Sequence, residues 1–186
     1  MNKTFVGAEA TVTVTDKEVI KNRTKKTWRH PKIDKKIRER RTRQEAKILR
    51  KLTVTPQLIE TDTTTITMKT VKGEQLSKNI TLQNIKKTAK AVTEMHKEDV
   101  YHGDLTTKNI MITPKQAYII DFGLGGLNAR IEDKAVDLHI LQTVLTSEKP
   151  SQINTLWNTF KKNYSPPQKQ EIFNKLEEVN KRGRYK

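Results

Sequence analysis

The spacing of the apolar residues changes near Gly73, and this change limits the fold more than any other feature of the chain. Before Gly73, apolar residues alternate or cluster over short stretches between turn residues, which is the pattern of β-strands. From Thr81 onward they recur every three or four positions, as in amphipathic helices. The sequence therefore predicts an α+β fold. A small strand-rich N-terminal lobe (residues 1–73) precedes a larger helical C-terminal lobe (residues 74–186), with the hinge near Gly73.

The individual strands and helices follow from the same spacing. A three-stranded meander is expected in the first 30 residues, and two more strands are expected between Gln57 and Val71. Beyond the hinge, a helix begins near Thr81 and short strands interrupt the helical pattern. The strands expected in the second lobe are 100–102, 110–112 and 118–120, and its later helices are 132–146, 151–163 and 168–180.

One helix is expected in the N-terminal lobe, between Pro31 and Leu52. Its apolar residues with helical spacing are Ile33, Ile37, Ile48, Leu49 and Leu52. Glu45 falls on the same apolar face, and a carboxylate there needs a partner. Arg41 also lies on this face, so the sequence leaves two alternatives equally open: a local salt bridge with Arg41, or a partner elsewhere in the chain.

Positive charge is concentrated in two segments. The 186 residues include 37 Lys or Arg and 21 Asp or Glu, which gives a net charge of +16. Residues 17–51 hold 16 of the cations against four acids, and a smaller basic cluster occupies residues 181–186. Because such segments attract polyanions, we expect contact with nucleic acid or a ribonucleoprotein. A solvated helix face is the alternative interpretation.

Composition excludes several other classes of protein. The chain has no cysteine, so disulfides, thiol nucleophiles and cysteine-based metal sites are excluded. Its four scattered histidines do not predict a His-rich metal site. No apolar stretch is long enough to span a bilayer, and the first ten residues lack a signal-peptide pattern. We therefore expect a cytoplasmic protein without membrane contact.

The residues that carry chemistry are concentrated between 101 and 123. Asp104 stands five residues before Asn109, and two short apolar strands then lead to Asp121-Phe122-Gly123. Each residue alone is an ordinary turn former. Together they place two acids and an amide at the ends of adjacent strands. This set suits phosphoryl transfer, in which one carboxylate orients the nucleophile while a carboxylate and an amide oxygen hold magnesium.

In this order, after a strand-rich lobe, these motifs resemble those of the protein-kinase superfamily. The resemblance implies a small bilobal kinase-like fold, with Asp104 as catalytic base and with Asn109 and Asp121 as metal ligands. It also implies that Lys21, on the third strand, pairs with the nucleotide phosphates and with Glu45 on the helix. His102, the motif histidine, is expected to be structural.

The same resemblance implies how ATP and Mg²⁺ bind between the lobes. The loop at Val6 and Gly7 would cover the phosphates, and the strand and hinge from Met68 to Val71 would receive adenine through backbone groups. Lys69 stands where an acidic hinge residue is common, so adenine contacts by side chains are left open.

Departures from the usual kinase pattern define a narrower branch. The phosphate-covering loop has one glycine, Thr106 replaces the usual lysine, and only Leu124–Ile131 separates Gly123 from the next helix. There is thus no activation segment. With the motifs Gly7-Ala8-Glu9-Ala10, His102-Gly103-Asp104-Leu105-Thr106-Thr107, 132–138 and Arg182-Gly183-Arg184, the chain resembles the small atypical kinase/ATPase subunit of the KEOPS complex over nearly its whole length.

That resemblance implies an ATPase and non-specific Ser/Thr kinase that supports threonylcarbamoyladenosine (t6A) modification of tRNA. Its implied partners are the threonylcarbamoyl-transferase subunit, the other KEOPS subunits, and tRNA bound through residues 17–51 and 181–186. A RIO-type kinase of ribosome maturation, a small-molecule phosphotransferase that shares His-Gly-Asp-Leu, and a nucleotide-binding RNA scaffold are the alternatives.

Overall fold

The computed structural model describes residues 3–183, and the contacts within it divide the chain into two compact units between Val71 and Lys72. Strands dominate the first unit and helices the second, so the predicted α+β class is confirmed. Within the described residues, no helix has both the length and the apolar character needed to cross a bilayer. Residues 184–186 of the predicted basic tail lie outside the described residues.

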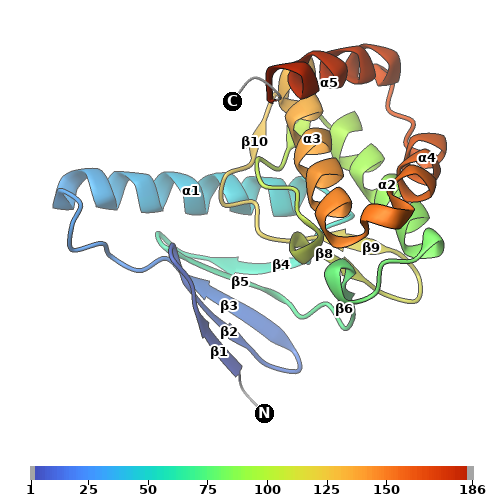
Figure 1. Cartoon of the computed structure of the whole chain (residues 1–186). Helices are drawn as coiled ribbons and strands as arrows, with labels where there is room; N and C mark the ends of the chain where they lie inside the picture. The colour runs from blue at the N-terminus through green and yellow to red at the C-terminus, as the bar shows by residue number, and fades with distance from the viewer. Residues whose placement is uncertain (1–2, 184–186) are drawn as a thin grey trace. The chain divides into compact units, whose positions relative to one another are not determined.

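The first unit contains a five-stranded antiparallel sheet in the order β1-β2-β3-β5-β4 (Figure 1). Its first three strands form the expected meander, and a bulge in β4 shifts the register between Leu58 and Glu60. Because β3 pairs with both β2 and β5, its backbone is fixed from both sides. The strands are β1 (Lys3–Val6), β2 (Thr11–Val14), β3 (Glu18–Asn22), β4 (Leu58–Thr61) and β5 (Thr65–Lys69).

Helix α1 (Pro31–Lys51) packs against β4 and β5. Proline stands in its first turn, where a missing N–H breaks no helical hydrogen bond. The core between helix and sheet is built on Leu49, Ile66 and Met68. Burying a side chain of this size contributes about 1.5–3 kcal/mol. This packing fixes which face of α1 turns toward the sheet.

The expectation that Ile33 lies on the buried face of this helix is wrong. Ile33 is 55% exposed, and the neighbouring Asp34 is buried instead. The cause is polar: Asp34 accepts hydrogen bonds from the backbone N–H of Lys26 and from the side chains of Arg29 and Arg38. The first turn of α1 is therefore anchored by a charged network rather than by apolar packing.

The second unit is mainly helical. Two small antiparallel sheets, β6-β8-β9 and β10-β7, carry the loops between the helices. Helix α2 packs against α4 and β9, and α3 packs against α5. The strands are β6 (Glu74–Gln75), β7 (Val100–Tyr101), β8 (Ile110–Ile112), β9 (Ala117–Ile119) and β10 (Gly126–Leu127). The helices are η1 (Leu76–Lys78), α2 (Leu82–Lys97), η2 (Thr107–Asn109), α3 (Ile131–Glu148), η3 (Pro150–Gln152), α4 (Ile153–Asn163) and α5 (Lys169–Gly183).

Local sequence signals start the two longest helices of this unit. The Thr81 side chain accepts a hydrogen bond from the backbone N–H of Asn84 and caps α2. At the start of α3, the Asp133 carboxylate accepts a hydrogen bond from the backbone N–H of Arg130. Between Gly123 and α3 the chain forms only β10 and a short connection, in keeping with the expected lack of an activation segment.

Candidate active site

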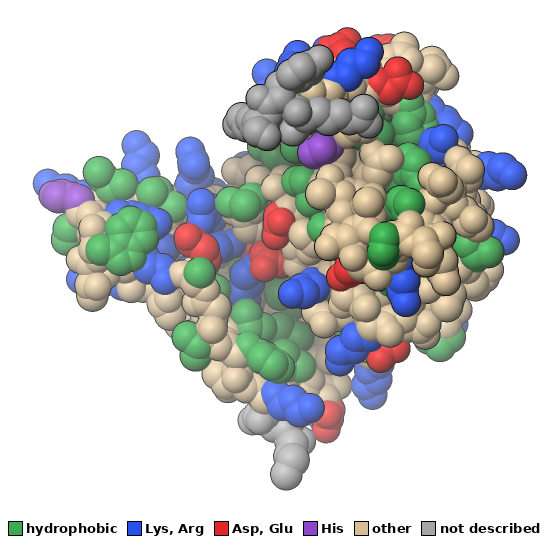
Figure 2. All heavy atoms as spheres, viewed as in Figure 1, with side chains coloured by type: hydrophobic (Ala, Val, Ile, Leu, Met, Phe, Trp, Pro, Cys, Tyr) green, Lys and Arg blue, Asp and Glu red, His purple; other side chains and the backbone are tan. Residues whose placement is uncertain are grey.

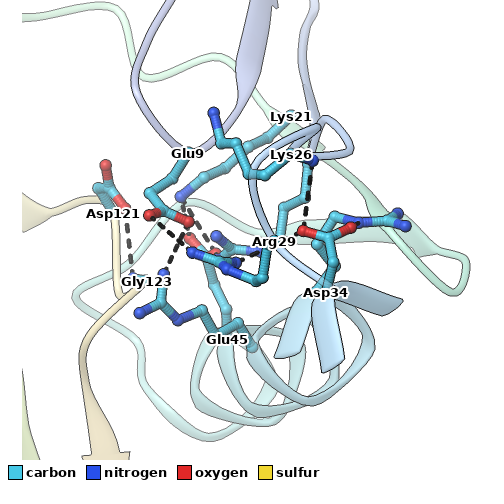
Figure 3. A network of polar contacts seen from close by, with 11 residues as sticks. Glu9, Lys21, Lys26, Arg29, Asp34, Glu45, Asp121 and Gly123 are labelled. Atoms are coloured by element: carbon cyan, nitrogen blue, oxygen red, sulfur yellow. Dashed lines mark hydrogen bonds and ion pairs between the residues drawn. The ribbon is translucent and has the colours of Figure 1, made fainter. Parts of the chain in front are cut away.

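The first unit carries a buried cluster of two cations around one carboxylate (Figure 3). The Nζ of Lys21 on β3 donates hydrogen bonds to both carboxylate oxygens of Glu45, at 2.9 and 3.1 Å. A guanidinium nitrogen of Arg23 donates to the same carboxylate. All three side chains are buried, and the Glu45 carboxylate fixes the position of the Lys21 Nζ.

Arg23 was not singled out from the sequence, although a signal was present. Arg23 lies one residue beyond β3 and two positions after Lys21, and the alternation of an extended chain turns both side chains to the same face. Its Nε is buried without a hydrogen-bond partner. Glu45 is thus held by two cations, unlike a simple kinase-type pair, in which one lysine meets one glutamate.

Arg41 is not the partner of Glu45, which settles the alternative that the sequence left open. The Nη1 of Arg41 instead donates to Glu9 Oε2 at 2.8 Å (Figure 3). Glu9 belongs to the loop between β1 and β2, where the N–H of Gly7 donates to the carbonyl of Ala10 at 2.9 Å. The loop expected to cover phosphates is therefore tied to α1 by an ion pair.

The other nucleotide-contacting residues expected in the first unit lie in different environments. Val6, at the end of β1, is 84% exposed. Met68 is buried in the core beneath α1, and Val71 ends the unit. The backbone N–H groups of Lys69 and Thr70 donate to the carbonyls of Gln57 and Lys17. The strand that leads to Val71 is thus held by main-chain hydrogen bonds.

In the second unit, hydrogen bonds join Asp104 to Asn109, and join the backbone of Asn109 to the residue that precedes Asp121. The Nδ2 of Asn109 donates to the backbone carbonyl of Asp104 at 2.8 Å and to its carboxylate at 3.1 Å. The N–H of Ile120 donates to the carbonyl of Asn109 at 2.9 Å, so Asp121 follows at the same end of the β8–β9 pair. The fold therefore places the Asp104 carboxylate beside the Asn109 amide and begins the Asp121 segment next to the Asn109 backbone.

Asp121 has a left-handed backbone, with φ of 64°. Such a conformation is uncommon outside glycine and is most often adopted by Asn, Asp and a few other residues. The Asp121 carboxylate accepts a hydrogen bond from the N–H of Gly123 at 3.2 Å. This local turn aims the side chain, and strained backbone of this kind clusters at functional sites.

His102 is locked in place by backbone groups, as expected for a structural residue. Its Nε2 donates to the carbonyl of Ile120 at 2.9 Å, and its Nδ1 accepts from the N–H of Asp104 at 3.1 Å. Both ring nitrogens are used, so the neutral imidazole joins the Asp104 segment to the Asp121 segment.

Two glycines let these segments approach closely. Gly103 has φ of 78°, and a Cβ there would lie 2.7 Å from the carbonyl oxygen of Leu124. Conversely, a Cβ on Gly125, in the second segment, would lie 2.7 Å from the carbonyl oxygen of Tyr101 in the first. The backbones are in contact where side chains would otherwise stand.

Asp137 on α3 supports the whole arrangement and was not assigned a role from the sequence. Its carboxylate is fully buried and accepts hydrogen bonds from the backbone N–H of His102 at 2.7 Å and of Gly103 at 2.8 Å. Its only sequence signal is an acid inside an apolar helical stripe, the same signal that marked Glu45.

A second histidine extends this support inward. The Nε2 of His96 lies 3.4 Å from the Asp137 carboxylate, and its Nδ1 lies 2.7 Å from the Tyr164 hydroxyl. Burial lowers the pKa of His96 below its ordinary value, and burial raises the pKa of Tyr164 above its ordinary value. Both groups are therefore neutral, and the buried Asp137 is held by donors rather than by a full cation.

The residues present fit a magnesium nucleotide. The Asn109 amide nitrogen is engaged by Asp104, which leaves the amide oxygen as the metal-binding atom. With the Asp121 carboxylate this gives hard oxygen ligands, which Mg²⁺ prefers. The Asp104 carboxylate is exposed and oriented, as a group that accepts a proton from a substrate hydroxyl must be.

These two sets of residues, on a strand-rich unit followed by a helical one, define a domain with a protein-kinase-like fold. The Rio2 kinase of Chaetomium thermophilum, solved as an ADP/Mg²⁺-phosphoaspartate complex, superposes with a TM-score of 0.64 over 99% of this chain and 71% of that one, at 13% identity. WaaP in complex with acyl carrier protein gives a TM-score of 0.61 over 97% and 88%, also at 13% identity. At this identity the likeness shows the fold alone. The chain belongs to the lipopolysaccharide kinase (Kdo/WaaP) family, whose model matches residues 37–164.

Closer relatives are found among curated archaeal proteins. A probable bifunctional tRNA threonylcarbamoyladenosine biosynthesis protein of Methanospirillum hungatei is 37% identical over 96% of this chain and 35% of its own length. The protein of the same name from Haloquadratum walsbyi is 34% identical over 100% of this chain and 36% of its own length. The chain thus spans about a third of these relatives and is homologous to their kinase part.

Proposed function

We propose that this chain is an ATP-dependent phosphotransferase or ATPase of the atypical Ser/Thr kinase type. One observation carries the proposal: the Asn109 amide holds the exposed Asp104 carboxylate at 3.1 Å, in a loop whose backbone is fixed by His102 and Asp137. A preorganised carboxylate beside an amide oxygen is what phosphoryl transfer requires. A turn-forming role alone gives no reason for the buried supports beneath it.

In this proposal each unit has its own task. Asp104 accepts the proton of the attacking hydroxyl or water, while Asn109 and Asp121 bind Mg²⁺, which would neutralise charge on the phosphates. Lys21, oriented by Glu45, binds the phosphates. The remaining contacts with ATP come from the loop at Val6 and Gly7 and from the segment Met68 to Val71.

We further propose that the activity serves t6A modification of tRNA as part of a KEOPS assembly. The support is the name of the curated relatives, probable bifunctional tRNA threonylcarbamoyladenosine biosynthesis proteins, in which the matching third is joined to further sequence. The partners would be the threonylcarbamoyl-transferase subunit, the other KEOPS subunits and tRNA. The net charge of +16, concentrated in residues 17–51, suits a polyanionic partner.

The alternatives have less support. A RIO-type role in ribosome maturation has the fold-level likeness to the Rio2 kinase at 13% identity, whereas the sequence relatives at 34–37% carry the t6A name. A nucleotide-binding scaffold without turnover does not require an oriented carboxylate at Asp104.

A turnover assay tests the proposal. The full chain is supplied with ATP and Mg²⁺, alone, with the partner domain of the relatives, and with tRNA, and phosphate release is measured. We expect Mg²⁺-dependent turnover that Asp121→Ala abolishes. Glu98→Gln, an acid in the same unit outside the described site, serves as the matched control. Undiminished Mg²⁺-dependent turnover by Asp121→Ala would make the site assignment wrong.

A further inference from the structure

The segment between β3 and α1 displays an aromatic ring that the proposed phosphotransferase site does not use. Trp28 is 75% exposed, whereas the other tryptophan, Trp157, is 6% exposed and stacks on Phe160. The guanidinium of Arg29 lies over the Trp28 ring, 4.7 Å from its centroid. Beyond the start of α1, Ile33 is exposed as well. One face of the indole therefore carries a cation.

Hydrogen bonds to the Asp34 carboxylate hold the turn that carries the Trp28 ring. Asp34 accepts a hydrogen bond from Arg38 Nε at 2.7 Å, from the Lys26 N–H at 3.3 Å and from Arg29 Nη1 at 3.5 Å (Figure 3). The hydrogen bond from Arg38 is the main reason that the pKa of Asp34 is lowered, so the carboxylate stays charged. Because Lys26 and Arg29 flank Trp28 in sequence, this network fixes the turn that presents it.

The surroundings of the ring are strongly cationic. Between residues 23 and 38 the only acid is Asp34, which is buried and already bonded to cations. Lysines and arginines crowd the surface over α1 (Figure 2). The exposed lysines nearest in sequence to Trp28 are Lys25, Lys32, Lys35 and Lys36. An apolar ring within such a field matches a ligand that is both flat and polyanionic.

We propose that Trp28 is a stacking platform for an unpaired base of RNA, and that the lysines around it bind the flanking phosphates. Base stacking on an aromatic side chain inside a basic groove is the general mode of single-strand recognition, and RNA loops offer such bases. The inference deepens the proposed tRNA contact and rests on it. An acidic protein patch would match the charge but would leave the flat ring and its stacked Arg29 without a counterpart.

The test separates stacking from charge. The full chain is titrated with short single-stranded oligoadenylate RNA and with inorganic polyphosphate, which has the charge but no bases. We expect oligoadenylate to quench the emission of the exposed Trp28, because the buried Trp157 is shielded. Trp28→Ala should weaken oligoadenylate binding about 5- to 100-fold, whereas Trp28→Phe should keep most of the affinity. Polyphosphate affinity and the salt dependence should stay unchanged.

Ile59→Ala is the matched control, because it removes another exposed apolar side chain of the same unit outside the cationic segment. Equal loss of both ligands in Trp28→Ala, or no loss of either, would overturn the stacking role. So would unchanged RNA binding together with lost binding of the relatives' partner domain, which would make Trp28 a protein-docking residue. If the wild-type chain binds neither ligand, the proposed tRNA contact fails as well.

Discussion

Asp137 offers the sharpest test of how the catalytic loop is held. In Asp137→Asn, one of two carboxylate oxygens that accept backbone N–H groups, at 2.7 and 2.8 Å, becomes an NH₂ group. A donor then faces a donor in a fully buried site. One hydrogen bond to a charged acceptor is lost, and one amide is left without an acceptor. We expect a loss of about 2–4 kcal/mol in the free energy of unfolding. This is a large part of the ~5–15 kcal/mol available to a domain.

The assay is urea denaturation combined with amide hydrogen exchange. Asp133→Asn is the control, since it lies one turn earlier on α3 and its partly exposed carboxylate caps the helix. In this control the free energy of unfolding should fall by about 1 kcal/mol. In Asp137→Asn the amides of His102 and Gly103 should exchange faster than in the control. If Asp137→Asn is no less stable than Asp133→Asn, and those amides exchange at the control rate, the supporting role of Asp137 is refuted.

Three further predictions concern chemistry, pH and the tail. Asp104→Asn keeps the side-chain shape but removes the base, so ATP binding measured by calorimetry should persist while turnover falls about 10²- to 10⁴-fold; lost binding would indicate a structural role instead. Burial lowers the pKa of His96 below its ordinary value of 6.5, so the unfolded chain binds this proton first. Stability should therefore be full above about pH 6.5 and fall below it, and a urea midpoint that stays flat between about pH 7.5 and 5 would contradict this. Deleting residues 181–186 should weaken tRNA association and flatten its salt dependence while ATP binding remains, and an unchanged salt slope would oppose a role for the tail.

The parts of the fold that could be predicted are those that local spacing controls. Strand alternation and helical periodicity gave the meander, α1 and the helices of the second unit, because each pattern reflects one face packed against its own neighbours. The failure at Ile33 has a local cause of another kind: Asp34 finds three donors and turns inward, and no hydrophobicity pattern records that exchange.

The candidate site divides in the same way. The position of Asn109 and Asp121 at one end of the β8–β9 hairpin was predictable because two short adjacent strands lead to it, and Asp104 joins Asn109 through hydrogen bonds within the preceding loop. The role of Asp137 was not, because its hydrogen bonds reach 34 and 35 residues back along the chain. Likewise, the choice of Lys21 and Arg23 over Arg41 as partners of Glu45 depends on how α1 packs on the sheet.

The reciprocal approach of Gly103 to Leu124 and of Gly125 to Tyr101 limits how this chain can diverge. A side chain at either glycine would meet main chain, which no substitution at a neighbouring position can shorten, so both positions are restricted to glycine. The connection after β10 is fixed as well, because the Ala129 N–H donates to the Asp99 carbonyl at 2.8 Å and Asn128 has a left-handed backbone with φ of 58°. A variant library that lengthens residues 122–126 would move Gly125 out of its contact with Tyr101 and should lose the fold. Loops grafted from larger kinases therefore have no room in this stretch of the chain.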